Sequence, residues 1–252
     1  MTKLQAYAKQ ILSLIDLTSL NNNDNDASII NLCKKATTVY GNVPAICIYS
    51  HFVPLAKKLL DGTGIKIATV TNFPHGMQNI ELALFETKLA ITLGAEEVDI
   101  VFPYHALINS DTNIGSKMIS GAKQICRNKI LKVIIESGEL HTPELIRTAS
   151  QISINNGADF IKTSTGKVAI NATLSATEIM LKVIKDSGEN CGFKAAGGVR
   201  SVIEAIKYLE LTTGIMDKAW VNSNNFRFGA SGLLDDVIAV LANISNSSDS
   251  TY

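Results

Sequence analysis

The chain has 252 residues, of which 46% are hydrophobic and 18% charged, so it can bury the core of a sizeable domain. Its 23 basic and 23 acidic residues balance, and no basic run is interleaved with aromatic residues, which argues against nucleic acid as a partner. No uncharged apolar stretch approaches the length of a membrane span, so no membrane association is expected.

Short apolar runs recur along the chain, and each is followed by a longer segment with helical periodicity. The N-terminal residues predict an amphipathic helix and lack the apolar run of a signal peptide. The expected strands are 14–17, 43–48, 65–70, 96–102, 131–136, 158–163, 192–195 and 226–229. Such near-continuous apolar strands suit a parallel sheet covered on both faces. Residues 218–221 also have a strand-like pattern and compete for the eighth place.

Helices are predicted between these strands. Residues 77–93 form one that stops at Gly94, and Thr142 before Pro143 marks the start of another. Segments 173–185 and 201–211 are two more. Eight such β-then-α units predict an α/β chain that is a single (β/α)₈ barrel over residues 1–252, with an extra N-terminal helix and a short, polar, flexible tail at about 244–252. An open doubly wound sheet is the alternative, but no G-x-G-x-x-G follows the first strand.

Four cysteines and four histidines show no metal-ligand spacing, so no metal is expected. The cysteines indicate reduced thiols and a cytoplasmic location. Cys47 ends the second strand, where it either lines a pocket or is a buried structural thiol.

Two lysines in strand-like runs carry the first chemical signal. Lys162 lies near the end of the sixth strand and Lys194 on the seventh. Lysine is rarely buried without a reason, and a buried amine beside a second cation favours its neutral, nucleophilic form. The alternative is that either side chain reaches solvent or pairs with a carboxylate.

Two carboxylates also lie inside apolar runs. Asp99 on the fourth strand either transfers protons around a bound carbonyl compound or holds a lysine in place. Asp16 on the first strand is at least as well explained as a structural carboxylate at the barrel mouth.

Three glycine turns follow the last three strands, as a phosphate site would require. They are Thr165-Gly166-Lys167, Gly197-Gly198-Val199-Arg200 and Gly229-Ala230-Ser231. A glycine turn lets backbone N–H groups approach an anion, and the helix expected from Ser201 adds its dipole. Each turn alone is a weak signal, but loops after strands seven and eight are the usual phosphate position of a barrel.

Four stretches together resemble one family. They are Glu-Val-Asp-Ile-Val (97–101), Leu-Lys-Val-Ile-Ile-Glu (131–136), Asp-Phe-Ile-Lys-Thr-Ser-Thr-Gly-Lys (159–167) and Gly-Phe-Lys-Ala-Ala-Gly-Gly-Val-Arg (192–200). They are similar to the deoxyribose-phosphate aldolases, which are class I aldolases, and the likeness extends from Ile-Asp-Leu-Thr (15–18) to Phe-Arg-Phe-Gly-Ala-Ser (226–231). The resemblance implies reversible cleavage of 2-deoxy-D-ribose 5-phosphate to D-glyceraldehyde 3-phosphate and acetaldehyde.

The resemblance also implies roles for residues. Lys162 would form a Schiff base without a cofactor, and Asp99 and Lys194 would transfer protons. The implied phosphate and substrate residues are Thr165, Gly166, Lys167, Gly197, Gly198, Arg200, Gly229, Ser231, Asp16, Thr18, Cys47 and Tyr252. Tyr252 would act from a mobile tail, unless the tail has no role. A homodimer is the family expectation.

Two departures from the family pattern are Ala195, where proline is common, and Gly232, where serine is common. The second removes a hydroxyl from the phosphate rim. Two other functions stay open at this point: another class I aldolase acting on a ketose phosphate or a keto acid, and a catalytically silent phosphosugar-binding protein.

Overall fold

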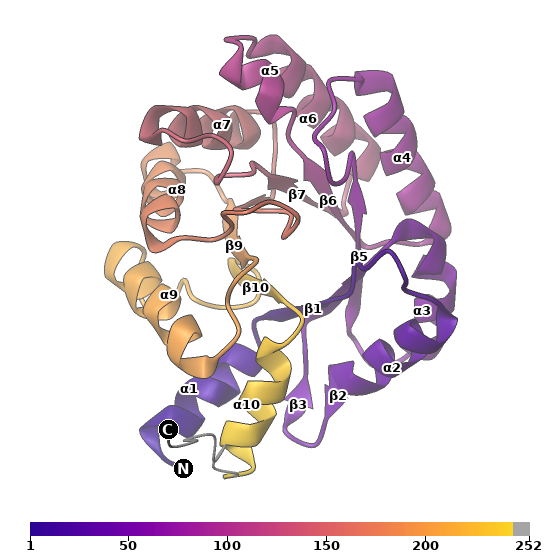
Figure 1. Ribbon diagram of the computed structural model, residues 1–252, viewed down its shortest axis with the longest axis vertical. Coiled ribbons are helices and arrows are strands. Elements are labelled where there is room, and N and C mark those ends of the chain that lie inside the picture. The colour runs from indigo at the N-terminus through magenta and orange to yellow at the C-terminus, as the bar shows by residue number, and fades with distance from the viewer. Residues whose placement is uncertain (244–252) are drawn as a thin grey trace, which may run out of the picture.

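Eight parallel strands close into a barrel surrounded by helices, in a computed structural model that describes residues 1–243 (Figure 1). In barrel order the strands are β1 (Ile15–Thr18), β4 (Ala45–Ile48), β5 (Lys66–Thr71), β6 (Glu97–Val101), β7 (Ile130–Ile134), β8 (Phe160–Lys162), β9 (Gly192–Ala196) and β10 (Phe226–Ala230). The predicted (β/α)₈ barrel is confirmed. The eighth strand is β10, and residues 218–221 lie in a turn region instead. The predicted tail and Tyr252 lie outside the described residues.

The described helices are α1 (Lys3–Leu12), α2 (Asp26–Ala36), α3 (Val53–Leu59), α4 (Ile80–Leu93), α5 (Tyr104–Ile108), α6 (Asn113–Cys126), α7 (Pro143–Asn155), α8 (Leu174–Ser187), α9 (Val202–Ile215) and α10 (Leu233–Leu241). Six of them, α1, α2, α4, α7, α8 and α9, begin after a residue whose side chain accepts a hydrogen bond from an N–H of the first turn. The Asn79 side chain accepts a hydrogen bond from the Leu82 N–H, so α4 starts three residues later than predicted. Gly94 ends α4 in the left-handed region, with φ 106°. None of the described helices is both long and apolar enough to cross a membrane.

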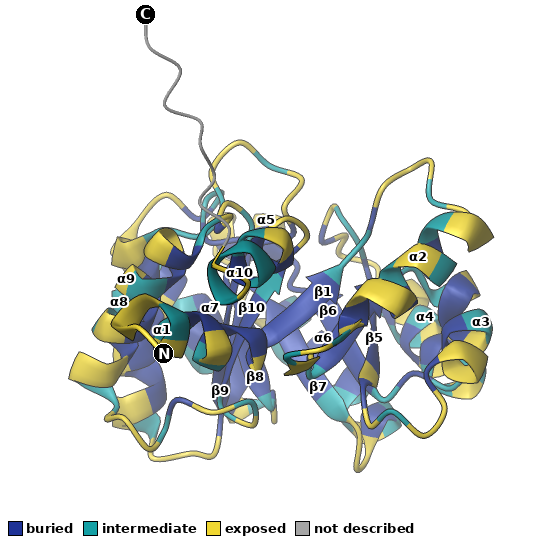
Figure 2. Ribbon diagram, turned by 90° about the horizontal axis from the view of Figure 1, so that it is seen from below, coloured by how far each residue is buried: buried dark blue, intermediate teal, exposed yellow. Residues whose placement is uncertain are grey.

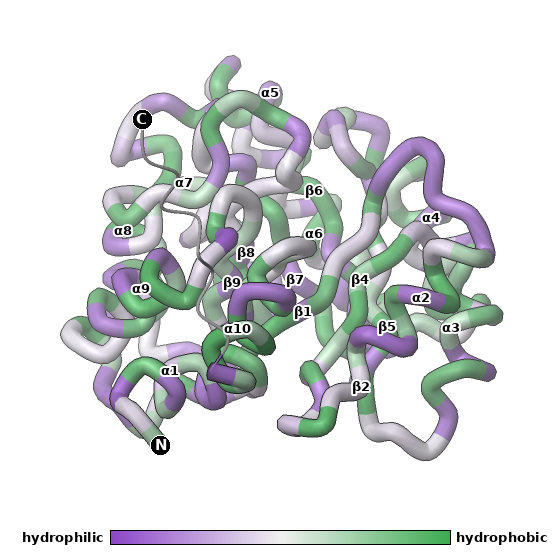
Figure 3. Tube along the Cα trace, turned by 60° about the horizontal axis from the view of Figure 1, so that its bottom comes forward, coloured by the Kyte–Doolittle hydropathy of each residue, from purple (hydrophilic) through white to green (hydrophobic). Residues whose placement is uncertain are grey.

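Three small elements were not predicted. A two-stranded antiparallel pair, β2 (Thr37–Thr38) and β3 (Gly41–Asn42), follows α2, and a 3₁₀ turn, η1 (Ser50–Phe52), precedes α3. The expected N-terminal helix is α1, which packs beside α10 and α9 on the outside of the barrel (Figure 1, Figure 3). The barrel strands are covered by these outer helices, so the strands are the most deeply buried part of the molecule (Figure 2).

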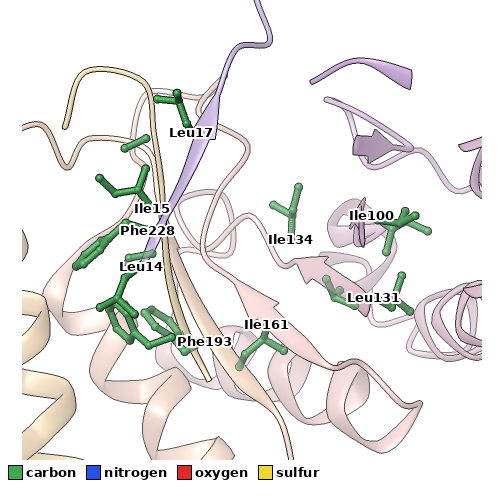
Figure 4. Close-up of a cluster of buried hydrophobic side chains, with 14 of the residues drawn as sticks. Leu14, Ile15, Leu17, Ile100, Leu131, Ile134, Ile161, Phe193 and Phe228 are labelled. Atoms are coloured by element: carbon green, nitrogen blue, oxygen red, sulfur yellow. The ribbon is translucent and has the colours of Figure 1, made fainter. Parts of the chain in front are cut away.

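Side chains on each strand alternate between the apolar layer under the helices and the barrel interior. Leu131, Ile161, Phe193 and Phe228 belong to the apolar layer (Figure 4). Their strand neighbours face the opposite way, into the interior. Because several of these neighbours are charged, the barrel interior is polar along one side, and this side holds the candidate site.

Candidate active site

A cavity of about 430 Å³ opens at the C-terminal ends of the strands. Its walls are the segments that follow β1, β8, β9 and β10, and the side chain of Lys162 lines it. This is the end of a (β/α)₈ barrel at which the connecting loops form active sites. The position therefore agrees with the loops that the sequence predicted for the site.

Lys162, Lys194 and Asp99 meet at the bottom of this cavity. Lys162 and Lys194 are Cα partners on the neighbouring strands β8 and β9, so both side chains point into the barrel. The Nζ atom of each lies 2.8 Å from the same oxygen of Asp99, Oδ2. Lys162 is 3% exposed, whereas Lys194 and Asp99 are fully buried. The three residues that the sequence singled out for chemistry are thus in direct contact.

A wider buried ion network surrounds this trio. Lys132 on β7 donates to Oδ1 of Asp99 at 2.9 Å and also to Glu97 on β6. Asp16 on β1 pairs with Lys194 and with Arg227 on β10. No sequence pattern indicated a role for Lys132, Glu97 or Arg227. Glu97 is two residues before Asp99 and so faces the same side of β6, a period-two signal that could have revealed it.

The network contains four cations and three carboxylates. Burial by itself raises the pKa of Asp99, but Lys132, Lys162 and Lys194 outweigh burial and hold this pKa well below its usual range. The pKa of Asp16 is lowered in the same way by Lys194, Arg227 and Lys132. Burial lowers the pKa of Lys194, yet Asp16 and Asp99 raise it above its ordinary value. In the site without substrate, Asp16 and Asp99 therefore favour the charged form of Lys194.

The predicted phosphate residues line the upper part of the cavity. They are Thr165, Gly166, Lys167, Gly197, Gly198, Arg200, Gly229 and Ser231, and Thr18 joins them from β1. Gly197 has φ 81°, and a Cβ there would lie 2.7 Å from the Asn171 side chain, so the turn needs glycine. Lys35, Asn21 and Asn171 also line the cavity, although no sequence pattern indicated them.

The N–H groups at the start of α9, the helix that follows the glycine pair, are not free to bind an anion as expected. The N–H groups of Arg200 and Ser201 donate to the Glu204 carboxylate, and the Val202 N–H donates to Asp236. Since these donors are already bound to carboxylates, the start of α9 is not a free anion site, and the dipole argument from Ser201 is corrected. The start of α10 has no side-chain cap at Gly232 and adjoins the cavity, so it is the better candidate.

A carboxylate missed by the sequence analysis supports the Thr165 turn. Glu136 follows β7 with φ 54° and is fully buried. It accepts hydrogen bonds from the Thr165 hydroxyl at 2.6 Å and from the Thr165 N–H at 3.2 Å. The same hydroxyl oxygen accepts from the Lys167 N–H at 3.0 Å, and burial raises the pKa of Glu136. Glu136 thus anchors the turn from below.

Two predicted substrate residues do not line the cavity. Asp16 is fully buried in the ion network, and Cys47 packs under the mouth with Leu20, Ala68 and Val70. Burial and the charge of Asp99 raise the pKa of the Cys47 thiol, so it is held as a neutral thiol. All four cysteines are unpaired and buried. Within residues 1–243 no three His, Cys, Asp or Glu side chains are grouped as metal ligands would be.

The fold and the lysine-lined cavity define a barrel protein with a candidate site at the C-terminal ends of the strands. The chain belongs to the DeoC/LacD family of aldolases, because the model of that family matches residues 10–219. It is therefore a member of an aldolase family, which confirms the resemblance seen in the sequence.

Solved structures of similar proteins agree on the fold. A Coccidioides immitis protein provisionally named deoxyribose-phosphate aldolase is 27% identical, with a TM-score of 0.83 over 92% of this chain and 86% of that one. A Toxoplasma gondii protein with the same provisional name has a TM-score of 0.88 at 20% identity, over 95% of both chains. The deoxyribose phosphate aldolase of Aeropyrum pernix, described as tetrameric, has a TM-score of 0.76 at 23% identity, over 96% of this chain and 98% of that one. The last two show the shared fold alone.

Proposed function

We propose that this protein is a deoxyribose-phosphate aldolase of deoxyribonucleoside catabolism. It would cleave 2-deoxy-D-ribose 5-phosphate reversibly to D-glyceraldehyde 3-phosphate and acetaldehyde. The observation that carries the proposal is the position of Lys162. Of the four cations in the ion network, Lys162 lines the cavity, while Lys132, Lys194 and Arg227 do not. An amine that reaches the cavity can meet a carbonyl group.

The charge of the network supports a nucleophilic amine at Lys162. Four cations face three carboxylates, so one cation can lose its proton without leaving a carboxylate unpaired. Lys162 contacts a single carboxylate oxygen, which it shares with the cationic Lys194. Loss of the Lys162 proton would leave that oxygen paired with Lys194, and the neutral amine is the form that attacks carbonyls.

The reaction would then follow from these positions. The Lys162 amine adds to C1 of the open-chain sugar, and loss of water gives an iminium ion. A base takes the proton of the C3 hydroxyl while the C2–C3 bond breaks, and the bonding electrons move into the iminium to form an enamine. Glyceraldehyde 3-phosphate leaves, C2 is protonated, and water releases acetaldehyde and the free amine. Asp99, which contacts both lysines, and Lys194 would transfer these protons directly or through a water molecule.

The phosphate group would bind at the opposite end of the cavity from Asp99. Arg200 and Lys167 supply positive charge there, and the turns at Gly197–Gly198 and Ser231–Gly232 supply backbone N–H groups. Among residues 1–243, the Arg200 guanidinium makes no ion pair, so it is available to an anion. Phosphate binding would orient the reacting carbons over Lys162.

Reductive trapping tests donor, intermediate and residue together. With acetaldehyde and borohydride, mass spectrometry should find one ethyl group on Lys162, and Lys162→Leu should lose both the label and the activity. Lys35→Leu, which removes another lysine of the cavity wall, should keep the label. Full turnover by Lys162→Leu would refute the assignment. Labelling of Lys162 by dihydroxyacetone phosphate or a keto acid, but not by acetaldehyde, would instead indicate a different class I aldolase.

A further inference from the structure

The wall of the cavity at the barrel mouth carries positive charges and, within the described residues, no carboxylate. Its cations are Lys162, which is buried, and Lys167, Arg200 and Lys35, which are exposed. Several cations around one hollow suit an anion that carries more than one negative charge. Lys167 and Arg200 already have a place in the proposed phosphate site, whereas Lys35 has none.

Lys35 reaches the cavity from a different part of the barrel. Lys167 and Arg200 follow β8 and β9, whereas Lys35 lies in the last turn of α2, the helix that follows β1. Leu32, three residues earlier on α2, also lines the cavity, so one side of this helix faces it. The Lys167 ammonium extends toward the same side, because it donates to the Leu20 carbonyl oxygen at 2.6 Å. Two ammonium groups therefore approach the loop after β1.

An ion pair holds Lys35 beside the start of α10. The Lys35 Nζ atom lies 3.1 and 3.3 Å from the two carboxylate oxygens of Asp235. Helix α10 follows β10, which pairs with β1, and Gly232 at its start lines the cavity. The side chains of Lys35 and Asp235 are 59% and 65% exposed. Exposed ion pairs are weak, so a phosphate with two negative charges can compete with the single charge of Asp235 for this ammonium.

Asp235 itself opposes the binding of an anion at α10. It lies in the first turn of the helix, where its negative charge counteracts the attraction of the helix start for a second anion. Its side chain does not line the cavity, so it acts through its charge and through Lys35. Lys35 thus connects the cavity wall to the carboxylate that would otherwise repel a phosphate there.

We propose that Lys35 is a third phosphate-binding cation, and that Asp235 is the counter-ion that the phosphate displaces from it. The inference rests on the proposed function, because it takes the substrate to be a phosphate ester. It assigns a binding role to a residue of α2, outside the loops after β8, β9 and β10. The ammonium would also offset the hydroxyl that Gly232 lacks at the same rim.

The first test measures binding of inorganic phosphate by isothermal titration calorimetry. Lys35→Met should raise the dissociation constant about 3–10-fold, and KM for 2-deoxyribose 5-phosphate by a similar factor, because one charge-assisted contact is lost. The matched control is Lys34→Met, which removes the neighbouring exposed lysine of α2 that does not line the cavity. The control should stay within about twofold of the parent. An unchanged constant in Lys35→Met, or an equal rise in the control, would overturn the proposal.

The second test examines the counter-ion. Asp235→Asn should lower the phosphate dissociation constant about two- to fivefold, because it frees Lys35 and removes a repulsive charge. In the Lys35→Met background the same change should gain less, since no ion pair remains to be broken. A pair that only joins α2 to α10 would weaken phosphate binding, or leave it unchanged, in both single variants. That result, or an equal gain in the two backgrounds, would contradict displacement of Asp235.

Reductive trapping separates this inference from the proposed reaction. Acetaldehyde carries no phosphate, so its labelling of Lys162 should not depend on Lys35. If the parent protein is not labelled but its phosphate binding depends on Lys35, the proposed reaction fails and the role of Lys35 stands. If Lys162 is labelled and phosphate binding does not respond to Lys35→Met, only the role of Lys35 is refuted.

Discussion

Replacement of Lys132 by methionine should shift the acid limb of the pH profile of kcat/KM to higher pH. Lys132 is fully buried and contacts Asp99, Glu97 and, at 3.7 Å, Asp16. Without Lys132 the network has three cations for three carboxylates. Neutralisation of all three carboxylates then requires the positive charge of Lys162, which contacts Asp99. We expect a lower rate near pH 7 that recovers as the pH rises.

The size of the effect follows from the geometry. Lys132 and Lys162 bind the two oxygens of one carboxylate at 2.9 and 2.8 Å, so their nitrogens face each other across it. At a separation of about 5–6 Å and an effective dielectric constant of about 20, two unit charges repel by roughly 3 kcal/mol. Relaxation and water reduce this value, and we expect the acid limb to move upward by about 1–2 pH units.

The assay is kcat/KM between pH 5 and pH 10 per folded molecule, with the folded fraction measured by circular dichroism. Loss of a buried ion partner costs about 3–5 kcal/mol, so unfolding must be monitored in the same samples. Glu97→Gln tests the same reasoning without relying on this variant, since removal of a negative charge should move the acid limb downward. An unchanged limb in Lys132→Met, or shifts in the same direction for both variants, would refute the electrostatic account.

Three further outcomes are expected. Arg200→Met should raise KM for the phosphorylated sugar about 10–100-fold, which corresponds to the free energy of one charge-assisted hydrogen bond. Turnover of unphosphorylated 2-deoxyribose should stay unchanged. Equal losses for both sugars would exclude a phosphate role for Arg200. Gly232→Ser should lower KM for the phosphorylated sugar by about two- to fivefold. A Cβ at this position meets no atom within 4 Å, and the added hydroxyl would adjoin the uncapped start of α10. An unchanged KM would count against phosphate binding at this helix. Asp16 and Asp99 have lowered pKa values in the fold, so in acid the unfolded chain binds more protons than the folded chain. The stability that these two residues contribute is therefore complete above about pH 5 and is lost progressively below it. Urea unfolding between pH 6 and pH 3 should show this loss, and Asp99→Asn should flatten the slope.

Periodicity was sufficient to predict the barrel because each of its strands carries a near-continuous apolar run. The eighth strand was ambiguous, since residues 218–221 and 226–229 have similar patterns. The choice depends on pairing, which no local pattern encodes: β10 hydrogen-bonds to both β9 and β1 and so closes the barrel. The β2–β3 pair was missed for a related reason, because two-residue strands are too short to show alternation.

The sequence placed Lys162 and Lys194 together because they lie on adjacent strands. It placed Asp99 with them because residues near the C-terminal ends of barrel strands face one site. It did not reveal Lys132 and Arg227, because each looks like an isolated charge that could reach solvent. Their burial depends on carboxylates on other strands, such as Glu97 for both of them. Likewise, the competition of Glu204 and Asp236 for the first N–H groups of α9 becomes visible only when α9 and α10 are packed together.

The imbalance of the ion network distinguishes a site from a structural feature. Burial of charges is costly, and a network that served only stability would pair every cation with a carboxylate or be replaced by apolar side chains. Here Lys132, Lys194 and Arg227 each contact two or more carboxylates, whereas Lys162 contacts one and faces the cavity. The uneven distribution leaves the excess positive charge at Lys162, the member of the network that lines the cavity. That is the arrangement expected where the amine itself must react.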